Sequence, residues 1–288
     1  MAPIIEITNL QKNFKDFALK GINLSLEQGF IMGFIGPNGA GKSTTIKLMM
    51  NLLKKDGGEI KLFGLDHLRH EREIKNRIGF VYDENHFYEE LTVTEMKNII
   101  APLYQNWDHG LFSKFTGDFD LPVKKKIKDL SKGMKMKFSL AVALSHHADL
   151  LIMDEPTSGL DPLIRRELLE ILSGVIQDEN KGVFFSTHIT SDLDKIADYI
   201  TLIHQGEIVF SVPKDQILDN YGLVKGEREL LDVDSRKYFI GLRENQFGFE
   251  ALVQDKREIK KKFGENVLIE KPTLEDVMLY HTRRDKNA

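Results

Sequence analysis

The segment 36–44 reads Gly-Pro-Asn-Gly-Ala-Gly-Lys-Ser-Thr and fits the pattern G-x-x-x-x-G-K-[ST]. It follows the apolar run 30–35, which predicts a buried strand, and it opens residues 43–53, which predict a helix. Glycines let such a loop point its N–H groups inward, and the helix start adds partial positive charge, so the segment predicts a phosphate-binding loop. Lys42 would reach the β- and γ-phosphates, and Ser43 would bind Mg²⁺. The expected nucleotide contacts are Gly36, Pro37, Asn38, Gly39, Ala40, Gly41, Lys42, Ser43 and Thr44.

A second chemical pattern is the apolar run 150–153, which ends in the carboxylates Asp154 and Glu155. In a phosphate-loop enzyme the first carboxylate lies beside Mg²⁺, and the second is placed to polarise an attacking water as a general base. Two adjacent carboxylates repel each other unless a cation compensates. A strand that merely ends in an acidic turn would also give this pattern. Beside a phosphate loop, metal-dependent phosphate chemistry is the better interpretation.

The chain resembles the ATP-binding subunit of an ABC transporter, because these two motifs and three others follow one another in the order that this family has. The resemblance covers residues 4–215, with Walker A at 36–44, Walker B at 150–155, a D-loop at 158–161, a switch-histidine segment at 186–188, and 130–134 in place of the signature LSGGQ. It implies an α/β P-loop NTPase core of the ABC ATPase type. An antiparallel β part, a helical subdomain and a small C-terminal α+β domain would complete this fold.

The resemblance also implies two ATP sites between two subunits arranged head to tail. Ser131 and Gly133 would bind the γ-phosphate held by the partner subunit, and His188 would contact the γ-phosphate or the attacking water. Asp161 would bridge the subunits, or simply cap the helix that starts at Pro162. Phe14 would stack on adenine; the alternatives are that Phe17 stacks instead or that Phe14 belongs to the core.

Two positions depart from the family pattern. Asp83 stands where a glutamine is expected; it would approach Mg²⁺ directly or through water, or it is a solvated turn residue. In the signature, Lys132 replaces a glycine and Met134 replaces a glutamine. Lys132 would add a cation near phosphate or, as the simpler interpretation, point to solvent. Such signatures look like those of bacterial exporter-type systems with separate membrane subunits.

Strands alternating with helices predict a mainly parallel sheet. The composition changes after about residue 218, and residues 219–288 are charge-rich and carry no nucleotide motif, so the 288 residues are expected to form two domains. We expect an ATPase domain at 1–218, with its helical subdomain at about 84–147, and an accessory domain at 219–288. In the latter, residues 231–242 predict one or two strands and residues 249–263 predict a basic helix. The alternative is a loosely ordered tail, against which the recurring apolar positions argue.

Composition narrows the function classes. The net charge of −4 argues against broad binding to nucleic acid, and the absence of cysteine excludes disulfides and thiol chemistry. We expect no signal peptide, and no apolar run reaches the ~18–20 residues of a membrane span. Any membrane role is therefore expected to act through a partner. Residues 84–130 would contact it, unless their aromatic side chains only form the subdomain core.

The expected function is an ATPase, using ATP and Mg²⁺, that drives transport through a separate transmembrane permease. It would act as a homodimer or as a heterodimer with a related ATPase subunit, without nucleic acid, in the cytoplasm and on the inner face of the cell membrane through its partner. The alternatives are a soluble ABC-type ATPase acting on a ribosome or nucleic-acid complex and a small-molecule P-loop kinase. A kinase would lack the signature and the switch histidine.

Overall fold

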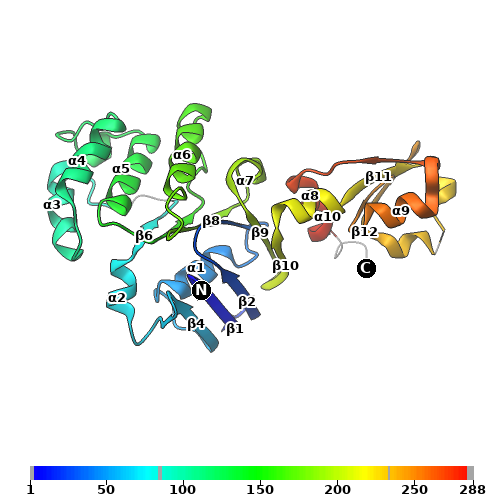
Figure 1. Cartoon of the computed structure of the whole chain (residues 1–288), viewed down its shortest axis with the longest axis horizontal. Helices are drawn as coiled ribbons and strands as arrows, with labels where there is room; N and C mark the ends of the chain where they lie inside the picture. The colour runs from blue at the N-terminus through cyan, green and yellow to red at the C-terminus, as the bar shows by residue number, and fades with distance from the viewer. Residues whose placement is uncertain (1–2, 84–85, 233, 284–288) are drawn as a thin grey trace.

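The computed structural model describes residues 3–83, 86–232 and 234–283. Predictions that fall on residues 1–2, 84–85, 233 and 284–288 lie outside this range. Figure 1 shows helices α3, α4 and α5 at one end, the strands β1, β2 and β4 below the middle, and the C-terminal elements at the other end. The strands are β1 Ile5–Asn13, β2 Ala18–Leu26, β3 Ile31–Ile35, β4 Gly57–Leu62, β5 Leu65–Asp66, β6 Ile78–Val81, β7 Leu150–Asp154, β8 Gly182–Thr187, β9 Tyr199–His204, β10 Glu207–Pro213, β11 Gly222–Gly226, β12 Phe239–Asn245, β13 Gly248–Val253 and β14 Val267–Glu270.

Ten α-helices and five short 3₁₀ turns connect these strands within the described residues. The α-helices are α1 Lys42–Met49, α2 Glu71–Asn76, α3 Val93–Ile100, α4 His109–Asp118, α5 Lys132–Leu144, α6 Pro162–Val175, α7 Thr190–Ile196, α8 Lys214–Asn220, α9 Lys256–Phe263 and α10 Leu274–Arg283. The 3₁₀ turns are η1 Ala101–Leu103, η2 Ile127–Asp129, η3 Arg228–Leu230, η4 Ser235–Tyr238 and η5 Gly264–Asn266. None of the described helices combines the length and the apolar character that a bilayer crossing requires.

The central sheet has six strands in the order β10-β9-β3-β8-β7-β6, and all pairs except β10–β9 are parallel. The expected mainly parallel sheet is therefore confirmed. Strands β3, β7 and β8 are buried at every position, which explains why their sequences are continuous apolar runs rather than alternating ones. Because their carboxyl ends meet at one edge of the sheet, the residues that follow β3, β7 and β8 are gathered there.

A second, antiparallel sheet has the order β2-β1-β4-β5. Helix α1 packs between the two sheets, since its buried Ile46, Leu48 and Met49 share one core with Ile7 of β1 and Phe184 of β8. This packing fixes the start of α1, and with it the phosphate loop, between two rigid layers. The helix ends at Met49, earlier than the sequence predicted.

Side-chain hydrogen bonds cap the starts of the three α-helices between β6 and β7. Thr92 and Glu95 form a capping box at α3, Asp108 caps α4 and Ser131 caps α5. Many of the aromatic residues here pack into the main core, but Tyr88 is 68% exposed and Leu103 is 71% exposed. The region thus has both an aromatic core and exposed apolar side chains.

The C-terminal sheet is antiparallel, in the order β12-β13-β11-β14. One face packs on α9 through Ile259, and the other joins α10 and the main core through Leu223 and Leu252. The expected basic helix at 249–263 is wrong in its first half, because 249–253 pairs with two neighbouring strands as part of β13. Residues 231–242 supply only the start of β12, preceded by η4. The domain boundary at residue 218 stays a prediction.

Candidate active site

The phosphate loop connects β3 to α1, and its glycines have a steric role. Gly39 and Gly41 have φ of 79° and 117°, which side chains rarely adopt. A Cβ at Gly36 would lie 2.3 Å from the carbonyl oxygen of Ile203. The loop is therefore held tightly against β9, and only glycine fits at Gly36.

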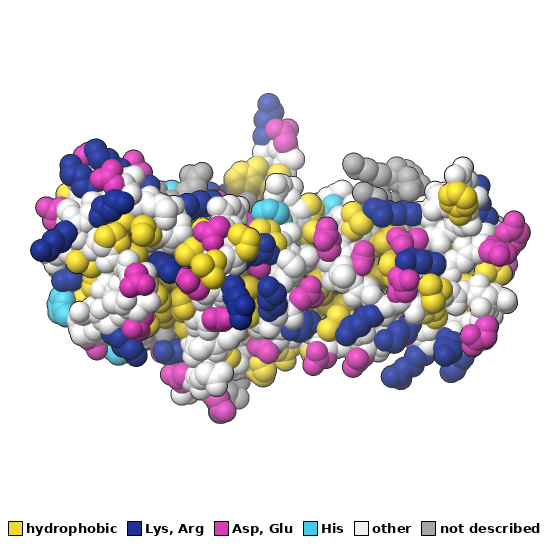
Figure 2. Space-filling view, turned by 90° about the horizontal axis from the view of Figure 1, so that it is seen from above, with side chains coloured by type: hydrophobic (Ala, Val, Ile, Leu, Met, Phe, Trp, Pro, Cys, Tyr) yellow, Lys and Arg dark blue, Asp and Glu magenta, His cyan; other side chains and the backbone are white. Residues whose placement is uncertain are grey.

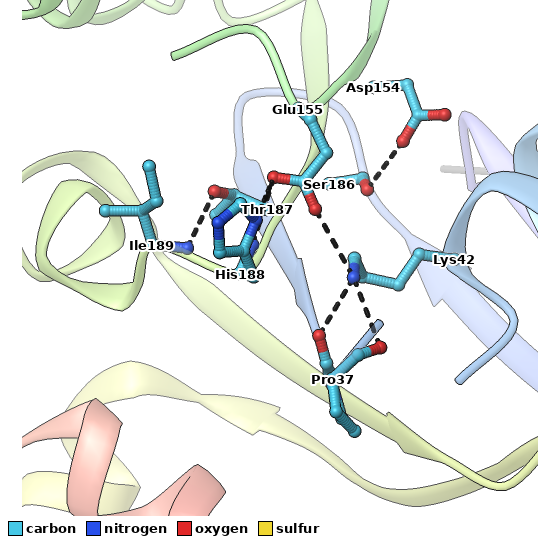
Figure 3. Close-up of polar contacts among 9 residues, drawn as sticks. Pro37, Lys42, Asp154, Glu155, Ser186, Thr187, His188 and Ile189 are labelled. Atoms are coloured by element: carbon cyan, nitrogen blue, oxygen red, sulfur yellow. Dashed lines mark hydrogen bonds and ion pairs between the residues drawn. The ribbon is translucent and has the colours of Figure 1, made fainter. Parts of the chain in front are cut away.

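Lys42 is buried at the first position of α1 and curls back over the loop. Its ammonium donates to the carbonyl oxygen of Gly36 at 2.8 Å and lies 3.5 Å from that of Pro37. It also forms an ion pair with Glu155 at 3.3 Å. The cation expected to hold phosphate is thus positioned by the loop and by the carboxylate at the end of β7 (Figure 3).

Glu155 connects Lys42 with His188. One carboxylate oxygen faces the Lys42 ammonium, and the other lies 2.7 Å from Nδ1 of His188 and accepts the His188 backbone N–H at 3.2 Å (Figure 3). The carboxylate is only 13% exposed, whereas the imidazole is 44% exposed. Glu155 has φ of 49°, which is uncommon for a residue with a side chain; strain of this kind persists where surrounding contacts enforce it. The sequence-predicted base and switch histidine are therefore in direct contact.

Asp154 lies at the end of β7 beside β8. The buried hydroxyl of Ser186 donates to its carboxylate at 2.9 Å. Burial raises the pKa of Asp154, and the charges of Asp83 and Glu155 raise it further, while hydrogen bonds from Ser43 and Ser186 oppose the shift. A carboxylate in this environment gains from a bound cation, which would offset both the burial and the repulsion.

The donor set fits Mg²⁺, which prefers oxygen ligands and usually takes one or two carboxylates with substrate phosphates. Ser43 and Asp154 supply a hydroxyl and a carboxylate, and Asp83 is near enough for its charge to act on Asp154. In the described part of the chain, no group of three or more His, Asp or Glu side chains could hold a metal alone. Water and the phosphates of the nucleotide would therefore supply the remaining ligands of any Mg²⁺ bound here.

Asp83 itself is exposed. With Tyr82 it lines a hollow of about 330 Å³ that also includes Lys132 and Lys135 of α5. The exposure agrees with a solvated turn residue, and the electrostatic effect on Asp154 agrees with a role near the cation. Both interpretations of Asp83 stay open.

The aromatic residues predicted to hold adenine lie together between β1 and β2. The rings of Phe14 and Phe17 are 6.2 Å apart, and Phe14 is 45% exposed, so it does not belong to the core. Phe17 contributes to a hollow of about 370 Å³ that is also lined by 37–40 of the phosphate loop. Both rings therefore remain open to a stacking role.

Ser131 and Gly133 lie away from this cluster. The Ser131 hydroxyl caps α5 by accepting the Met134 N–H at 3.2 Å, and Gly133 packs on Ile164 of α6. Among the described residues, neither makes a hydrogen bond with the phosphate loop. Lys132 is exposed, as the simpler interpretation expected, but a Cβ at Gly159 would lie 2.9 Å from its ammonium, so it also lies beside the D-loop.

One functional contact was missed by the sequence reasoning. Ser186 was read only as part of the switch-histidine segment, whereas its hydroxyl binds Asp154. A small polar residue at the end of an otherwise apolar buried strand is the signal that could have found it, because a buried hydroxyl needs a partner.

Comparisons with known proteins identify the family of the chain. The family model described as "ABC transporter" matches residues 19–158. A model described as "AAA domain, putative AbiEii toxin, Type IV TA system" matches residues 124–193. The bacitracin transport ATP-binding protein BcrA of Bacillus licheniformis is 34% identical over 75% of this chain and 72% of its own length. The lantibiotic transport ATP-binding protein SrtF of Streptococcus pyogenes is 31% identical over 74% of this chain and 92% of its own length.

Solved structures show the same fold. A structure titled "Structure of ATP binding subunit of ABC transporter" has a TM-score of 0.69 and 26% identity, covering 75% of this chain and 92% of the other. CbiO1 from Clostridium perfringens has a TM-score of 0.66 and 22% identity, covering 76% and 92% of the two chains. With its P-loop NTPase core and the order of its motifs, the chain belongs to the family of ABC transporter ATP-binding subunits.

Proposed function

We propose that this subunit hydrolyses MgATP and that the hydrolysis drives transport through a separate membrane subunit. One observation carries the chemistry: the Glu155 carboxylate lies 3.3 Å from the Lys42 ammonium and 2.7 Å from the His188 imidazole. The candidate base therefore lies between a phosphate-binding cation and a histidine that can hold the attacking water. Phosphoryl transfer needs this combination of positioning and charge stabilisation.

The residues of the chain have separate tasks in this proposal. The loop N–H groups and Lys42 hold the phosphates, Glu155 accepts the proton of the attacking water, and His188 orients that water or the γ-phosphate. Asp154, Ser43 and, in one interpretation, Asp83 hold the metal. Bound Mg²⁺ would neutralise charge on the β- and γ-phosphate oxygens. Phe14 or Phe17 would stack on the adenine.

The separation of Ser131 and Gly133 from the phosphate loop supports a shared site. Each would complete the ATP site of a partner subunit, closing a dimer around two nucleotides. Both halves of the site are present in this chain, so a homodimer is chemically allowed, as is a heterodimer with a related subunit.

The membrane partner would bind near residues 83–107, where Tyr88 and Leu103 expose apolar surface. Dimer closure would be transmitted there, and the subunit would lie on the inner face of the cell membrane through that contact. The relatives named for bacitracin and lantibiotic transport support a transport role of the exporter type. The transported substrate would be set by the membrane chain.

The rival function, an ATPase acting on a ribosome or nucleic-acid complex, has less support. In Figure 2, Lys/Arg and Asp/Glu side chains are both present over most of the visible face, with several Lys/Arg side chains together toward the lower right. Nucleic-acid binding usually requires a strongly basic domain, whereas the net charge of this chain is −4. Affinity purification of the tagged chain from membranes decides between the two: a polytopic membrane protein supports transport, and ribosomal components without one contradict it.

The dimer mechanism is tested with Glu155→Gln, which removes the base and keeps the phosphate loop. We expect a monomer that becomes a dimer only with MgATP, measured by size-exclusion chromatography with light scattering. Glu73→Gln, at an exposed glutamate on α2, is the matched control and should hydrolyse ATP like the wild type. Normal turnover by Glu155→Gln would remove Glu155 from the catalytic role.

A further inference from the structure

An ion pair between the partly exposed Arg165 and the buried Asp192 connects the helix after the D-loop with the helix after the switch histidine. Arg165 lies in the first turn of α6, and its Nε donates to Asp192 Oδ1 at 2.5 Å. Its Nη2 donates to the Ser191 hydroxyl at 2.9 Å. Asp192 lies in the first turn of α7 and is 0% exposed. The pair therefore joins two segments far apart in sequence, each beside a part of the proposed site.

The pair is poorly suited to stabilise the fold. Among the described residues, the second carboxylate oxygen of Asp192 is buried without a hydrogen-bond partner. Burying the Asp192 carboxylate costs desolvation, and with one oxygen unsatisfied its ion pair with the 27% exposed Arg165 recovers only part of that cost. A role in position explains the pair better than a role in stability.

Helix α7 needs such an anchor. It has only seven residues, Thr190–Ile196, and its start has no side-chain cap, so it has little stability of its own. It begins two residues after His188. On its other side, Leu193 packs so closely on β3 that a Cβ at Gly33 would lie 2.5 Å from its Cδ1. The placement of α7 against α6 and β3 therefore contributes to the position of His188, together with the end of β8 and the contact with Glu155.

Helix α6 is fixed at the same end by the D-loop. The Asp161 carboxylate caps it, accepting the N–H groups of Leu163 and Ile164 at 3.1 Å each. Arg165 follows one turn later. A displacement of Asp161 on dimer closure would thus reach α7 through Arg165 and Asp192.

We propose that Arg165 and Asp192 are positioning residues that couple the D-loop to His188, so that the histidine meets Glu155 correctly only when both helices are in register. This inference rests on the proposed function, because the pair would act only through the roles proposed there for His188 and Glu155. It concerns the rate of hydrolysis and not the binding of ATP, since neither residue contacts the phosphate loop in the described chain.

The test is a double-mutant cycle on ATP hydrolysis by the purified chain, with Arg165→Met, Asp192→Asn and the double variant. We expect each single variant to lower kcat about tenfold, the scale of a coupled pair, while KM for ATP changes by less than about twofold. The double variant should lose no more than the worse single one. Arg165→Lys should recover part of kcat, because it restores the charge without the planar fork.

Arg166→Met is the matched control. Arg166 is the next residue on α6, and its ion pair with Glu170 is exposed, with side-chain exposures of 76% and 65%. It should keep wild-type kcat. Thermal unfolding and the binding of a fluorescent ATP analogue show whether each variant is folded and binds nucleotide.

If the wild type hydrolyses ATP, any of three results would overturn the inference. These are wild-type kcat in both single variants, additive losses in the double variant, or losses of kcat no larger than the loss of folded, ATP-binding protein. If Arg165→Met does not fold, the cycle is run with Arg165→Lys and the same criteria apply. A wild type that binds ATP but does not hydrolyse it, either alone or together with its co-purified ATPase and membrane partners, would instead overturn the proposed function, and the inference with it.

Discussion

The Ser186 hydroxyl should control the pH at which Asp154 can bind Mg²⁺. Asp154 is buried, near two other carboxylates, and its pKa is already raised mainly by burial. Ser186→Ala removes a 2.9 Å hydrogen bond to the ionised carboxylate and leaves nothing in its place. The ionised form loses the stronger interaction, because a carboxylate accepts a hydrogen bond more strongly than a protonated carboxyl group does, so the pKa of Asp154 should rise further.

The magnitude follows from the nature of the bond. A hydrogen bond to a charged group is worth about 1.5–3 kcal/mol, and 1.36 kcal/mol corresponds to a tenfold change in proton affinity. The variant carboxylate should therefore bind its proton about ten- to one-hundredfold more tightly. Because the proton and Mg²⁺ compete for the same oxygens, the Mg²⁺ requirement should begin to rise about one to two pH units higher than in the wild type.

The assay is the Mg²⁺ concentration that gives half-maximal ATP hydrolysis, measured across the pH range in which the chain stays folded. Wild type and variant should agree at alkaline pH, where Asp154 is ionised in both, and diverge as the pH falls. Ser145→Ala is the control, since Ser145 is also fully buried but donates to the carbonyl oxygen of Ala141. A ratio of Mg²⁺ requirements that stays constant across pH would refute the reasoning.

Three further predictions concern other parts of the site and fold. Lys42→Ala should abolish tight ATP binding, because the phosphates lose their main side-chain cation and Glu155 loses its buried partner; wild-type affinity in a nucleotide-binding titration would contradict the assignment. Asp83→Gln should change the Mg²⁺ dependence of turnover if Asp83 acts near the cation, and unchanged kinetics would support the solvated turn. His146 is buried against the carbonyl oxygens of Val142 and Ile78, and burial lowers its pKa. Because its pKa is lower in the folded state, the unfolded chain binds more protons below about pH 6.5, and stability present above that pH is lost as the pH falls, by at most about 1.4 kcal/mol per pH unit. His146→Gln should flatten this dependence in urea denaturation measured between about pH 5 and 7, and an unchanged slope would show that another group is responsible.

Local patterns were sufficient where a motif carries its own chemistry and geometry. The phosphate loop needs glycines at fixed spacing because the backbone itself binds phosphate, so its sequence predicts both structure and ligand class. The apolar runs that became β3, β7 and β8 predicted buried parallel strands, and the carboxylates Asp154 and Glu155 at the end of one run indicated a site at the edge of the sheet. These inferences need only neighbours along the chain.

Local patterns failed in the C-terminal region for a physical reason. Residues 249–253 have an apolar spacing that suits either a helix or a strand, and the choice was made by pairing with β11 and β12 on both sides. Strand preference depends on such cross-strand neighbours more than on intrinsic propensity. The pattern of residues within a segment does not show which strands will become its neighbours.

The sequence by itself determined the family, and it predicted the phosphate loop and the carboxylate and histidine residues of the candidate site. Only the tertiary structure decided that Glu155 lies between Lys42 and His188, that Ser186 holds Asp154, and that Arg165 reaches Asp192 across two helices. These contacts join positions that are distant along the chain. They arise because parallel strands bring their carboxyl ends to one edge and helices pack above it, and the spacing of residues within any one segment does not encode that meeting.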